Sequence, residues 1–395
     1  MKTSKCDILA VENRFLDQEQ SGTSVSPPDQ DVLEIHRAIP GYAPTPLHSL
    51  SGLAERLGIG NILVKDESQR FGLNAFKALG ASYGMYRVLK QRSKTTLSPR
   101  ELFAGTHPMS DEPLTFAAAT EGNHGRAVAW AARKLGMNAV IFAPADASQS
   151  RLDNIRGQGA EVRLVKGTYD DVVEQAALES AAHGWQVIAD FGYDGYLEIP
   201  SWIESGYSTI FIEIAGQLEQ NGWSYPGVVM LQAGGGCFAA GAIRAIRHLW
   251  KTQPRFACVE PVEAACLLAS AQSQTGELTQ ATGKLDTICA GLNVPTPSLT
   301  SWPTLRSEVD VFLAIEDEWV KDAMRHLYHP VGSDEKIISG ESGAAGLAGL
   351  IALQSADQLD AMRETLGLDA DTTVLVINTE GDTDPEFFRH IVGEA

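Results

Sequence analysis

Short apolar runs alternate along the chain with longer segments whose apolar residues recur at helical spacing. Each run is continuous rather than alternating with polar residues, which is typical of strands buried on both faces of a parallel sheet. The predicted strands are 61–65, 115–120, 138–143, 161–166, 186–190, 227–233, 256–260 and 373–378, and the predicted helices are 124–136, 169–183, 200–220 and 237–250. The repeated order of strand and helix predicts an α/β fold of doubly wound parallel sheets with right-handed crossovers. Three polar segments are predicted to be loops: 21–30, 91–100 and 272–286.

Polar residues follow four of the predicted strands at the point where each strand ends. TFAAAT is followed by EGNHG, QVIAD ends in Asp190, GVVMLQA is followed by GGGCF, and TVLVI is followed by NTEGDTD. Turn residues are expected wherever strands end. In open α/β sheets, however, ligands bind at the carboxyl ends of the strands. Four such segments therefore favour one shared site over four unrelated turns.

Charge and cysteine content narrow the class of protein. The 395 residues include 31 Lys+Arg and 50 Asp+Glu, a formal net charge of −19. Nucleic acids and anionic membranes bind basic patches, so this balance favours a small-molecule partner instead. Five cysteines, an odd number without CxxC spacing, indicate a reducing compartment. Because we find neither a signal peptide nor an apolar run of about 18 residues, we expect a cytoplasmic protein without a membrane span.

A glycine-rich junction between a predicted strand and a predicted helix suggests a phosphate site. It reads AGGGCFAAGAIRAI and contains Gly234, Gly235, Gly236 and Cys237. Glycines allow main-chain N–H groups to converge, and the positive end of the helix dipole adds to the attraction for an anion. The segment matches neither GxGxxG nor GxxxxGK[ST], so a dinucleotide or Walker-type loop is not indicated. A turn needed only for packing of helix on sheet is the alternative.

Lys77 lies in the apolar, glycine-flanked stretch GLNAFKALGASY. A surface lysine in the first turn of a helix is the usual interpretation of such a residue. An ammonium group near apolar side chains loses hydration, which lowers its pKa and favours its use as a nucleophile toward carbonyl compounds. A phosphate site and a lysine that forms a Schiff base are together what pyridoxal phosphate (PLP) requires.

Two further segments carry candidate ligands for a ring cofactor. In EGNHG, Asn123 is a candidate donor to a ring oxygen, and His124 is a candidate base, ligand or helix-start residue. No second histidine stands at ligand spacing from His124, so we predict no metal site. In NTEGDTD, Asn378 or Thr379 is a candidate partner of a ring nitrogen, with a helix cap as the alternative.

Several of these motifs resemble fold type II PLP enzymes, the tryptophan synthase β group, and in particular the diaminopropionate ammonia-lyase family. The resemblance runs from about residue 35 to the C-terminus. It rests on KDESQRFGLNAFKALG, GNHGRAVAWAA, DFGYDGYLEIPSWIESGY, AGL at 290–292, ISGESGAAGL and VLVINTEGDTD. It implies two doubly wound parallel-sheet domains with the site between them. The implied division is an N-terminal extension at 1–34, a large PLP-binding domain at 35–85 and 191–395, and a small domain at 86–190.

The same resemblance implies roles for individual residues toward the cofactor. Lys77 would carry PLP as a Schiff base, and Asn123 would contact the phenolic oxygen of the cofactor. The main chain of Gly234, Gly235, Gly236 and Cys237 would bind the phosphate. Asn378, with Thr379 beside it, would face the pyridine nitrogen. A neutral partner there does not keep the ring protonated, which suits elimination better than transamination.

The resemblance implies β-elimination of 2,3-diaminopropionate to pyruvate and ammonia, with the family's two carboxylates at Glu121 and Asp190. The family has aspartate where this chain has Glu121, and a side chain longer by one methylene moves the carboxylate by about 1 Å, enough to cost ~100-fold in rate. Two alternatives remain open: a PLP-dependent lyase, dehydratase or β-replacement enzyme for another β-substituted amino acid such as serine or threonine, and a catalytically silent binding protein. The family resemblance also implies a homodimer.

Overall fold

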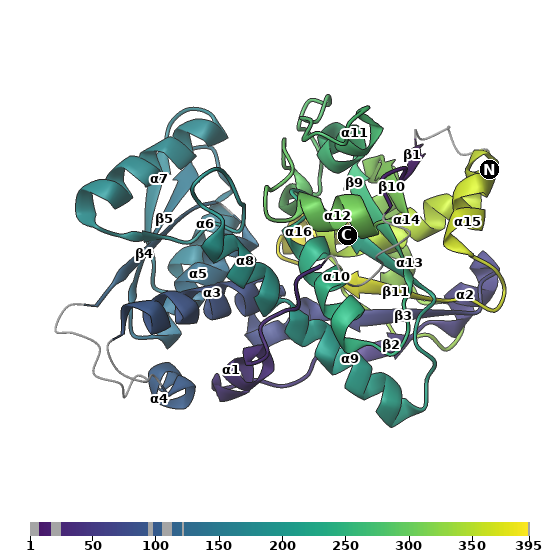
Figure 1. Ribbon diagram of the computed structural model, residues 1–395, viewed down its shortest axis with the longest axis horizontal. Helices are drawn as coiled ribbons and strands as arrows, with labels where there is room; N and C mark the ends of the chain where they lie inside the picture. The colour runs from purple at the N-terminus through teal and green to yellow at the C-terminus, as the bar shows by residue number, and fades with distance from the viewer. Residues whose placement is uncertain (1–7, 17–24, 94–97, 105–112, 121, 394–395) are drawn as a thin grey trace. The chain divides into compact units, whose positions relative to one another are not determined.

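The computed structural model describes the residues 8–16, 25–93, 98–104, 113–120 and 122–393 (Figure 1). The chain divides into two compact units, which we call the large and the small unit. The large unit comprises residues up to 28, 44–69 and 210–395, and the small unit comprises 29–43 and 70–209. The predicted division placed residues 77–85 in the large domain and 86–92 in the small one, whereas all of helix 77–92 belongs to the small unit.

The large unit is built on a seven-stranded sheet in the order β1-β10-β9-β8-β11-β3-β2. The five inner strands are parallel, and the two edge strands, β1 and β2, are antiparallel to their neighbours. The strands are β1 (Ile8–Glu12), β2 (Leu47–Ser49), β3 (Asn61–Asp66), β8 (Val228–Gln232), β9 (Arg255–Pro261), β10 (Val311–Ile315) and β11 (Thr373–Asn378). All residues of β8 and β10 are buried, as the continuous apolar runs predict for strands covered on both faces.

Helices cover both faces of this sheet (Figure 1). On one face, α14 packs on β8, β9, β10 and β11 and shares a core with Met230, Val259 and Leu313. On the other face, Trp302 of α12 lies 5.9 Å from Phe312 between ring centroids. The helices are α2 (Ser51–Leu57), α10 (Cys237–Leu249), α11 (Cys266–Gln272), α12 (Trp302–Glu308), α13 (Asp317–Tyr328), α14 (Glu341–Ser355), α15 (Asp360–Leu366) and α16 (Pro385–Val392). Helix α9 (Ser208–Asn221) starts in the small unit and continues into the large one.

The small unit has a four-stranded parallel sheet in the order β6-β5-β4-β7. Its strands are β4 (Thr115–Ala119), β5 (Asn138–Pro144), β6 (Glu161–Val165) and β7 (Gln186–Val187). Its helices are α1 (Val32–Ala38), α3 (Lys77–Arg92), α4 (Pro99–Phe103), α5 (Asn123–Lys134), α6 (Gln149–Arg156), α7 (Tyr169–His183) and α8 (Glu198–Gly206).

Helices α5 and α7 lie on opposite faces of the four-stranded sheet. Residues Val172 and Ala176 of α7 share a core with Phe142, whereas Gly125 of α5 lies against Ile141. Successive side chains of a strand point to opposite faces, so these contacts place the two helices on different sides. The sheet is therefore doubly wound, as the alternation of strands and helices predicts.

The predicted strands are confirmed in position, with one difference in extent: the segment 186–190 pairs as a strand only at Gln186–Val187. The helix expected at 200–220 is two helices, α8 and α9, separated at Tyr207. Strands β1, β2 and β10 were not predicted. Of the predicted loops, 272–286 contains no helix or strand after Gln272. In 91–100, α3 extends to Arg92 and α4 begins at Pro99, and the first part of 21–30 lies outside the described residues. No helix in the described ranges has the length and apolar character to cross a bilayer.

Candidate active site

Lys77 is the first residue of α3, and its amine contacts a carboxylate far away in the sequence. Nζ lies 2.5 Å from Oδ2 of Asp190, and the two side chains are 18% and 25% exposed. The ring centroids of Phe76 and Tyr207 lie 5.3 and 6.0 Å from the same nitrogen. The apolar setting predicted for Lys77 is thus present, together with an acid that the local sequence does not contain.

The glycines that follow Lys77 are explained by the packing of α3. A Cβ atom at Gly80 would lie 2.7 Å from side-chain atoms of Ile203 on α8 and of Tyr207 directly after it. A Cβ at Gly84 would lie 3.0 Å from Ile203 as well. The small residues therefore let α3 and α8 approach closely, and this packing places the first turn of α3 beside the ring of Tyr207.

Asp190 follows β7, and a tyrosine from the next turn braces the main chain before it. The hydroxyl of Tyr196 donates to the main-chain oxygen of Val187 (3.0 Å) and accepts from the N–H of Ala189 (3.1 Å). The Tyr196 ring stacks on that of Tyr193 at 5.0 Å. Sequence reasoning identified the GY…IP…WI pattern only by resemblance and gave Tyr196 no role.

His124 joins Lys77 beside Asp190. Its Nδ1 lies 3.6 Å from Oδ2 of Asp190, and its Nε2 lies 2.8 Å from the main-chain oxygen of Ile188. Partial burial by itself would raise the pKa of Asp190, but the charges of His124 and Lys77 and the hydrogen bond from Lys77 outweigh it and hold that pKa well below its usual range. Asp190 is therefore ionised and able to accept a proton.

The segment that carries the other predicted carboxylate is described in part. Helix α5 begins at Asn123, immediately after the end of β4 and the turn that follows it. Glu121 lies outside the described residues, so its position stays a prediction. Arg126 on α5 donates from Nη1 to the main-chain oxygen of Leu73 at 3.0 Å, which ties this helix to the loop before Lys77.

The predicted phosphate loop of the large unit joins β8 to α10. Gly236 has φ +95°, a left-handed conformation, and a Cβ there would lie 2.5 Å from Leu305. The main-chain oxygen of Gly235 accepts from the N–H of Ser298 at 2.9 Å, which fixes the loop. Among the described residues, no protein group accepts a hydrogen bond from the N–H of Gly234, Gly235 or Gly236. Main-chain donors without a protein partner at the start of a thirteen-residue helix fit an anionic group such as a phosphate.

Asn378 ends β11, and its amide is held by groups of the large unit itself. Its Nδ2 lies 2.8 Å from Oδ1 of Asp66 and 3.0 Å from the main-chain oxygen of Ile338. Both partners only accept, so the orientation of the amide is fixed and both of its hydrogens are used. Its Oδ1 is buried without a hydrogen-bond partner in the described part of the chain.

Thr379, the next residue, keeps a hydrogen to donate. Its Oγ1 accepts from Nε2 of Gln232 at 3.1 Å, and the same Nε2 donates to the main-chain oxygen of Ile377 at 2.8 Å. Because a carbonyl oxygen only accepts, this atom of Gln232 is the nitrogen, and the hydroxyl hydrogen of Thr379 points elsewhere. The sequence analysis assigned no role to Gln232. Its position as a polar residue at the end of a buried strand was the feature that could have indicated one.

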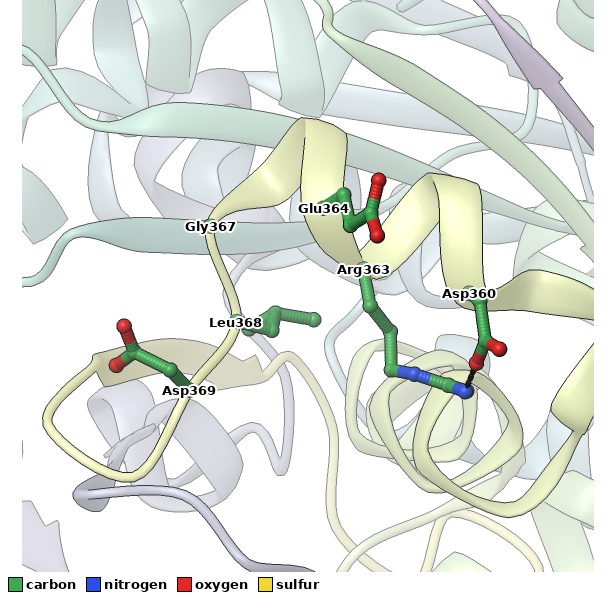
Figure 2. Close-up of a pocket in the computed structure, with 6 residues that line it drawn as sticks. All are labelled: Asp360, Arg363, Glu364, Gly367, Leu368 and Asp369. Atoms are coloured by element: carbon green, nitrogen blue, oxygen red, sulfur yellow. Dashed lines mark ion pairs between the residues drawn. The ribbon is translucent and has the colours of Figure 1, made fainter.

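A separate pocket of the large unit, about 390 Å³ in volume, lies along α15 and the turn that leads to β11 (Figure 2). It is lined by Asp360, Arg363, Glu364, Gly367, Leu368 and Asp369. Arg363 is ion-paired with Asp360, and the remaining carboxylates disfavour an anionic ligand. The pocket is next to the beginning of β11, whereas Asn378 is at its end, so it includes no predicted site residue.

Comparison with known proteins identifies the class to which this fold and these residues belong. The pattern of the family described as "Pyridoxal-phosphate dependent enzyme" matches residues 38–379. The chain belongs to this family of PLP enzymes, which confirms the predicted fold type II and cofactor. The structure of a threonine deaminase from Solanum lycopersicum, 22% identical with a TM-score of 0.71 over 100% of this chain and 99% of that one, shares the fold.

Within this class the chain is a member of the diaminopropionate ammonia-lyase family. It is 39% identical to the diaminopropionate ammonia-lyase of Escherichia coli (strain K12) over 391 residues, 99% of this chain and 97% of that protein. The Salmonella typhimurium (strain LT2) enzyme is 40% identical over 92% of this chain and 91% of its own. A crystal structure of the E. coli enzyme, solved with an aminoacrylate-PLP azomethine reaction intermediate, has a TM-score of 0.87 with 38% identity, covering 99% of this chain and 98% of that one.

Proposed function

We propose that this protein eliminates the β-amino group of 2,3-diaminopropionate, so that one substrate molecule and one water give pyruvate and two ammonia. The ion pair between Lys77 and Asp190 is the observation that carries the proposal. It places an amine suited to bind a carbonyl cofactor beside a carboxylate suited to accept a proton. The identity of 39% to an enzyme of that name over nearly the full chain supports the choice of substrate.

The residues of each unit fit PLP by their chemistry. Lys77 would bind the cofactor through its amine, the main-chain N–H groups of Gly234–Cys237 would hold its phosphate, and Asn123 would contact its phenolic oxygen, as the family resemblance implies. Between the two residues proposed for the pyridine nitrogen, Thr379 offers a hydroxyl hydrogen, whereas Asn378 has both amide hydrogens bonded to Asp66 and Ile338. We therefore assign the contact with the nitrogen to Thr379 and a supporting role to Asn378.

The reaction needs groups that move protons at defined atoms. When bound, PLP withdraws electrons from the α-carbon of the amino acid attached to it, which makes the Cα proton acidic. Asp190, ionised in this structure, accepts that proton from the L-substrate. Lys77 or Glu121 would supply the proton with which the β-amino group leaves as ammonia.

Substrate choice is tested by incubating the PLP-loaded protein with each enantiomer of diaminopropionate, serine and threonine. We expect pyruvate from diaminopropionate, with two ammonia for each pyruvate. Keto-acid release from serine or threonine alone would indicate a dehydratase acting on another β-substituted amino acid. A purified protein that binds no chromophore absorbing in the visible range would indicate a catalytically silent relative.

The attachment point is tested separately. Borohydride reduction followed by peptide mapping should place the pyridoxyl group on Lys77, and Lys77→Ala should abolish turnover. The matched control is Lys90→Ala on the same helix, whose side chain is 53% exposed. The Lys90→Ala protein should retain both the pyridoxyl label on Lys77 and the activity of the parent. A label on any lysine other than Lys77 contradicts the assignment.

Assembly and location extend the proposal. We propose a homodimer in the cytoplasm, as the family resemblance implies. The four cysteines in the described ranges are buried and are not in disulfides, which suits a reducing compartment. Light scattering of the purified chain measures the assembly, and a mass of one or four chains would contradict the dimer.

A further inference from the structure

His124 is held in one orientation by its contact with a main-chain carbonyl. Its Nε2 lies 2.8 Å from the oxygen of Ile188, and a carbonyl oxygen accepts hydrogen bonds but does not donate them. Nε2 therefore carries a hydrogen. In a neutral ring the second nitrogen, Nδ1, then has a lone pair and no hydrogen.

That second nitrogen faces a carboxylate. Nδ1 lies 3.6 Å from Oδ2 of Asp190 and makes no hydrogen bond within the described part of the chain. The His124 side chain is 8% exposed, so little water reaches it. A lone pair beside an ionised carboxylate is repelled, whereas an N–H at the same place is attracted. The arrangement favours the doubly protonated ring whenever Asp190 is ionised.

Lys77 and His124 both approach the same oxygen of Asp190. Under the proposed function, Lys77 loses its ammonium charge when it is bonded to the cofactor, whereas His124 does not bond the cofactor. Both approach Oδ2, from α3 and α5 respectively. The proposed function requires Lys77 to be bonded to the cofactor during part of each turnover, when it is no longer a free ammonium. Tyr196 also lies near Asp190, but burial raises its pKa and it stays neutral. Of the two described cations paired with Asp190, His124 is then the one that remains.

We propose that His124 is a positioning residue that keeps a proton on Nδ1 and thereby keeps Asp190 ionised and oriented while Lys77 is bonded to the cofactor. The proposal rests on the proposed function for its role in turnover. The pairing of His124 with Asp190 is a property of the chain alone. The pairing and the role in turnover are therefore tested by different measurements.

The pairing is tested without cofactor, by nitrogen NMR of ¹⁵N-histidine-labelled protein. The signal of His124 is the one that disappears in His124→Gln. In Lys77→Ala, which removes the competing ammonium, we expect the nitrogen shifts of His124 at neutral pH to be those of a ring with hydrogen on both nitrogens. Adding Asp190→Asn removes the facing carboxylate, so the Nδ1 signal should move toward that of a nitrogen without hydrogen. Identical His124 signals in the two variants would overturn the proposal whatever the substrate of the enzyme.

The role in turnover is tested by the pH profile of kcat/KM for L-diaminopropionate. In His124→Gln the loss of the positive charge beside Asp190 should raise the pKa of that carboxyl, so the acidic limb should move to higher pH. The loss of activity should therefore be largest on the acidic side of the profile and small on the alkaline side. A uniform loss at every pH would show a merely structural role and overturn the proposal. If His124→Gln does not fold, the comparison of Lys77→Ala with Lys77→Ala/Asp190→Asn still decides the pairing.

Discussion

The hydroxyl of Tyr196 accepts a hydrogen bond from the N–H of Ala189, the residue immediately before Asp190, at 3.1 Å. It also donates to Val187, so one side chain fixes the main chain that leads to the proposed base. The bond belongs to the turn that follows Asp190 in the sequence. The position of the carboxylate thus depends on a residue that does not itself contact the amine.

Removing this hydroxyl should misplace Asp190 without unfolding the protein. Tyr196→Phe loses two hydrogen bonds, about 1 kcal/mol each, and keeps the ring stack with Tyr193. We expect kcat on L-diaminopropionate to fall about tenfold, because small displacements of a catalytic group have large effects on rate. Tyr193→Phe is the control, since its exposed ring makes the same stack and its hydroxyl makes no such bond. Equal rates in the two variants would contradict the bracing role.

Arg126 should position the loop that precedes Lys77. This loop contains two non-glycine residues in the left-handed region, Phe71 and Asn74, both with φ 53°, and such conformations persist only where their surroundings hold them. Arg126→Leu removes the hydrogen bond to Leu73, and we expect about 1–2 kcal/mol lower stability. We also expect slower labelling of Lys77 by PLP and borohydride.

The matched control for this variant is Arg133→Leu, two turns further along α5. Its guanidinium bonds the side chain of Gln158 at the surface. Its loss should change the melting temperature and the labelling rate little. If Arg133→Leu slowed labelling as much as Arg126→Leu, the effect would belong to the whole helix rather than to the loop contact.

Most of the parallel strands were predictable from the sequence because burial on both faces leaves a local signal, although the fully buried β10 was missed. The run TVLVIN became β11 with the predicted bounds. Strands β1 and β2 lack that signal, because they are short antiparallel edge strands with partly buried residues. The end of the QVIAD run left the sheet for a contact with Tyr196, which no pattern within 186–190 encodes. Position at the edge of the sheet, rather than composition, explains why β1 and β2 were missed.

For the site, residue types were predictable and their partners were not. Lys77 and Asp190 are separated by 113 residues, so their ion pair depends on the folding of α3, β7 and α8 together. From the sequence, His124 could be a base, a ligand or a helix-start residue. Only the fold places it beside Asp190. That Asn378 faces a ring stays a prediction, and nothing in the sequence indicated that its amide hydrogens bond Asp66 and Ile338.

The phosphate loop should tolerate no side chain at Gly236. An alanine there would combine φ +95° with a Cβ only 2.5 Å from Leu305. We expect a loss of about 1–3 kcal/mol in stability and a weaker affinity for PLP, measured by titration of the apoprotein. Gly216→Ala in α9 is the control, since nothing lies within 4 Å of its Cβ. It should stabilise the protein by about 0.5–1 kcal/mol and leave PLP affinity unchanged. Unchanged affinity in Gly236→Ala would indicate that the loop has another role.

Asn378→Asp should create a pH-dependent defect. It places a second carboxylate at the 2.8 Å contact with Asp66, and two such groups share a proton because both cannot ionise. The folded-state pKa of the pair rises above its unfolded value. Stability is therefore retained at low pH and lost as the pH rises through the raised pKa. Melting temperatures should differ from the parent more at pH 8 than at pH 5.

The double variant Asn378→Asp/Asp66→Asn serves as the control for this effect. It restores one amide and one carboxylate at the same contact. The pH dependence should then return to that of the parent. A defect that persists equally at all pH values in the double variant would show that packing, rather than charge, causes it.

The last prediction concerns the two carboxylates and the two enantiomers of the substrate. The family resemblance implies that the aspartate of the GNHG loop serves the D-substrate and that the later aspartate serves the L-substrate. Asp190 is retained here and is ionised beside Lys77, so the L-substrate should react at the normal rate. Glu121 replaces the other aspartate, and its longer side chain should slow the D-substrate by up to about 100-fold.

Two variants separate these roles. Asp190→Asn should remove most activity on the L-enantiomer, because an amide of the same shape does not accept the Cα proton. Glu121→Asp should raise activity on the D-enantiomer and leave the L-enantiomer unchanged. Initial rates of pyruvate release on each pure enantiomer measure both effects. Equal rates on the two enantiomers in the parent protein would show that the length of residue 121 does not limit the reaction. Glu121 would then belong to the recognition of the substrate rather than to proton transfer.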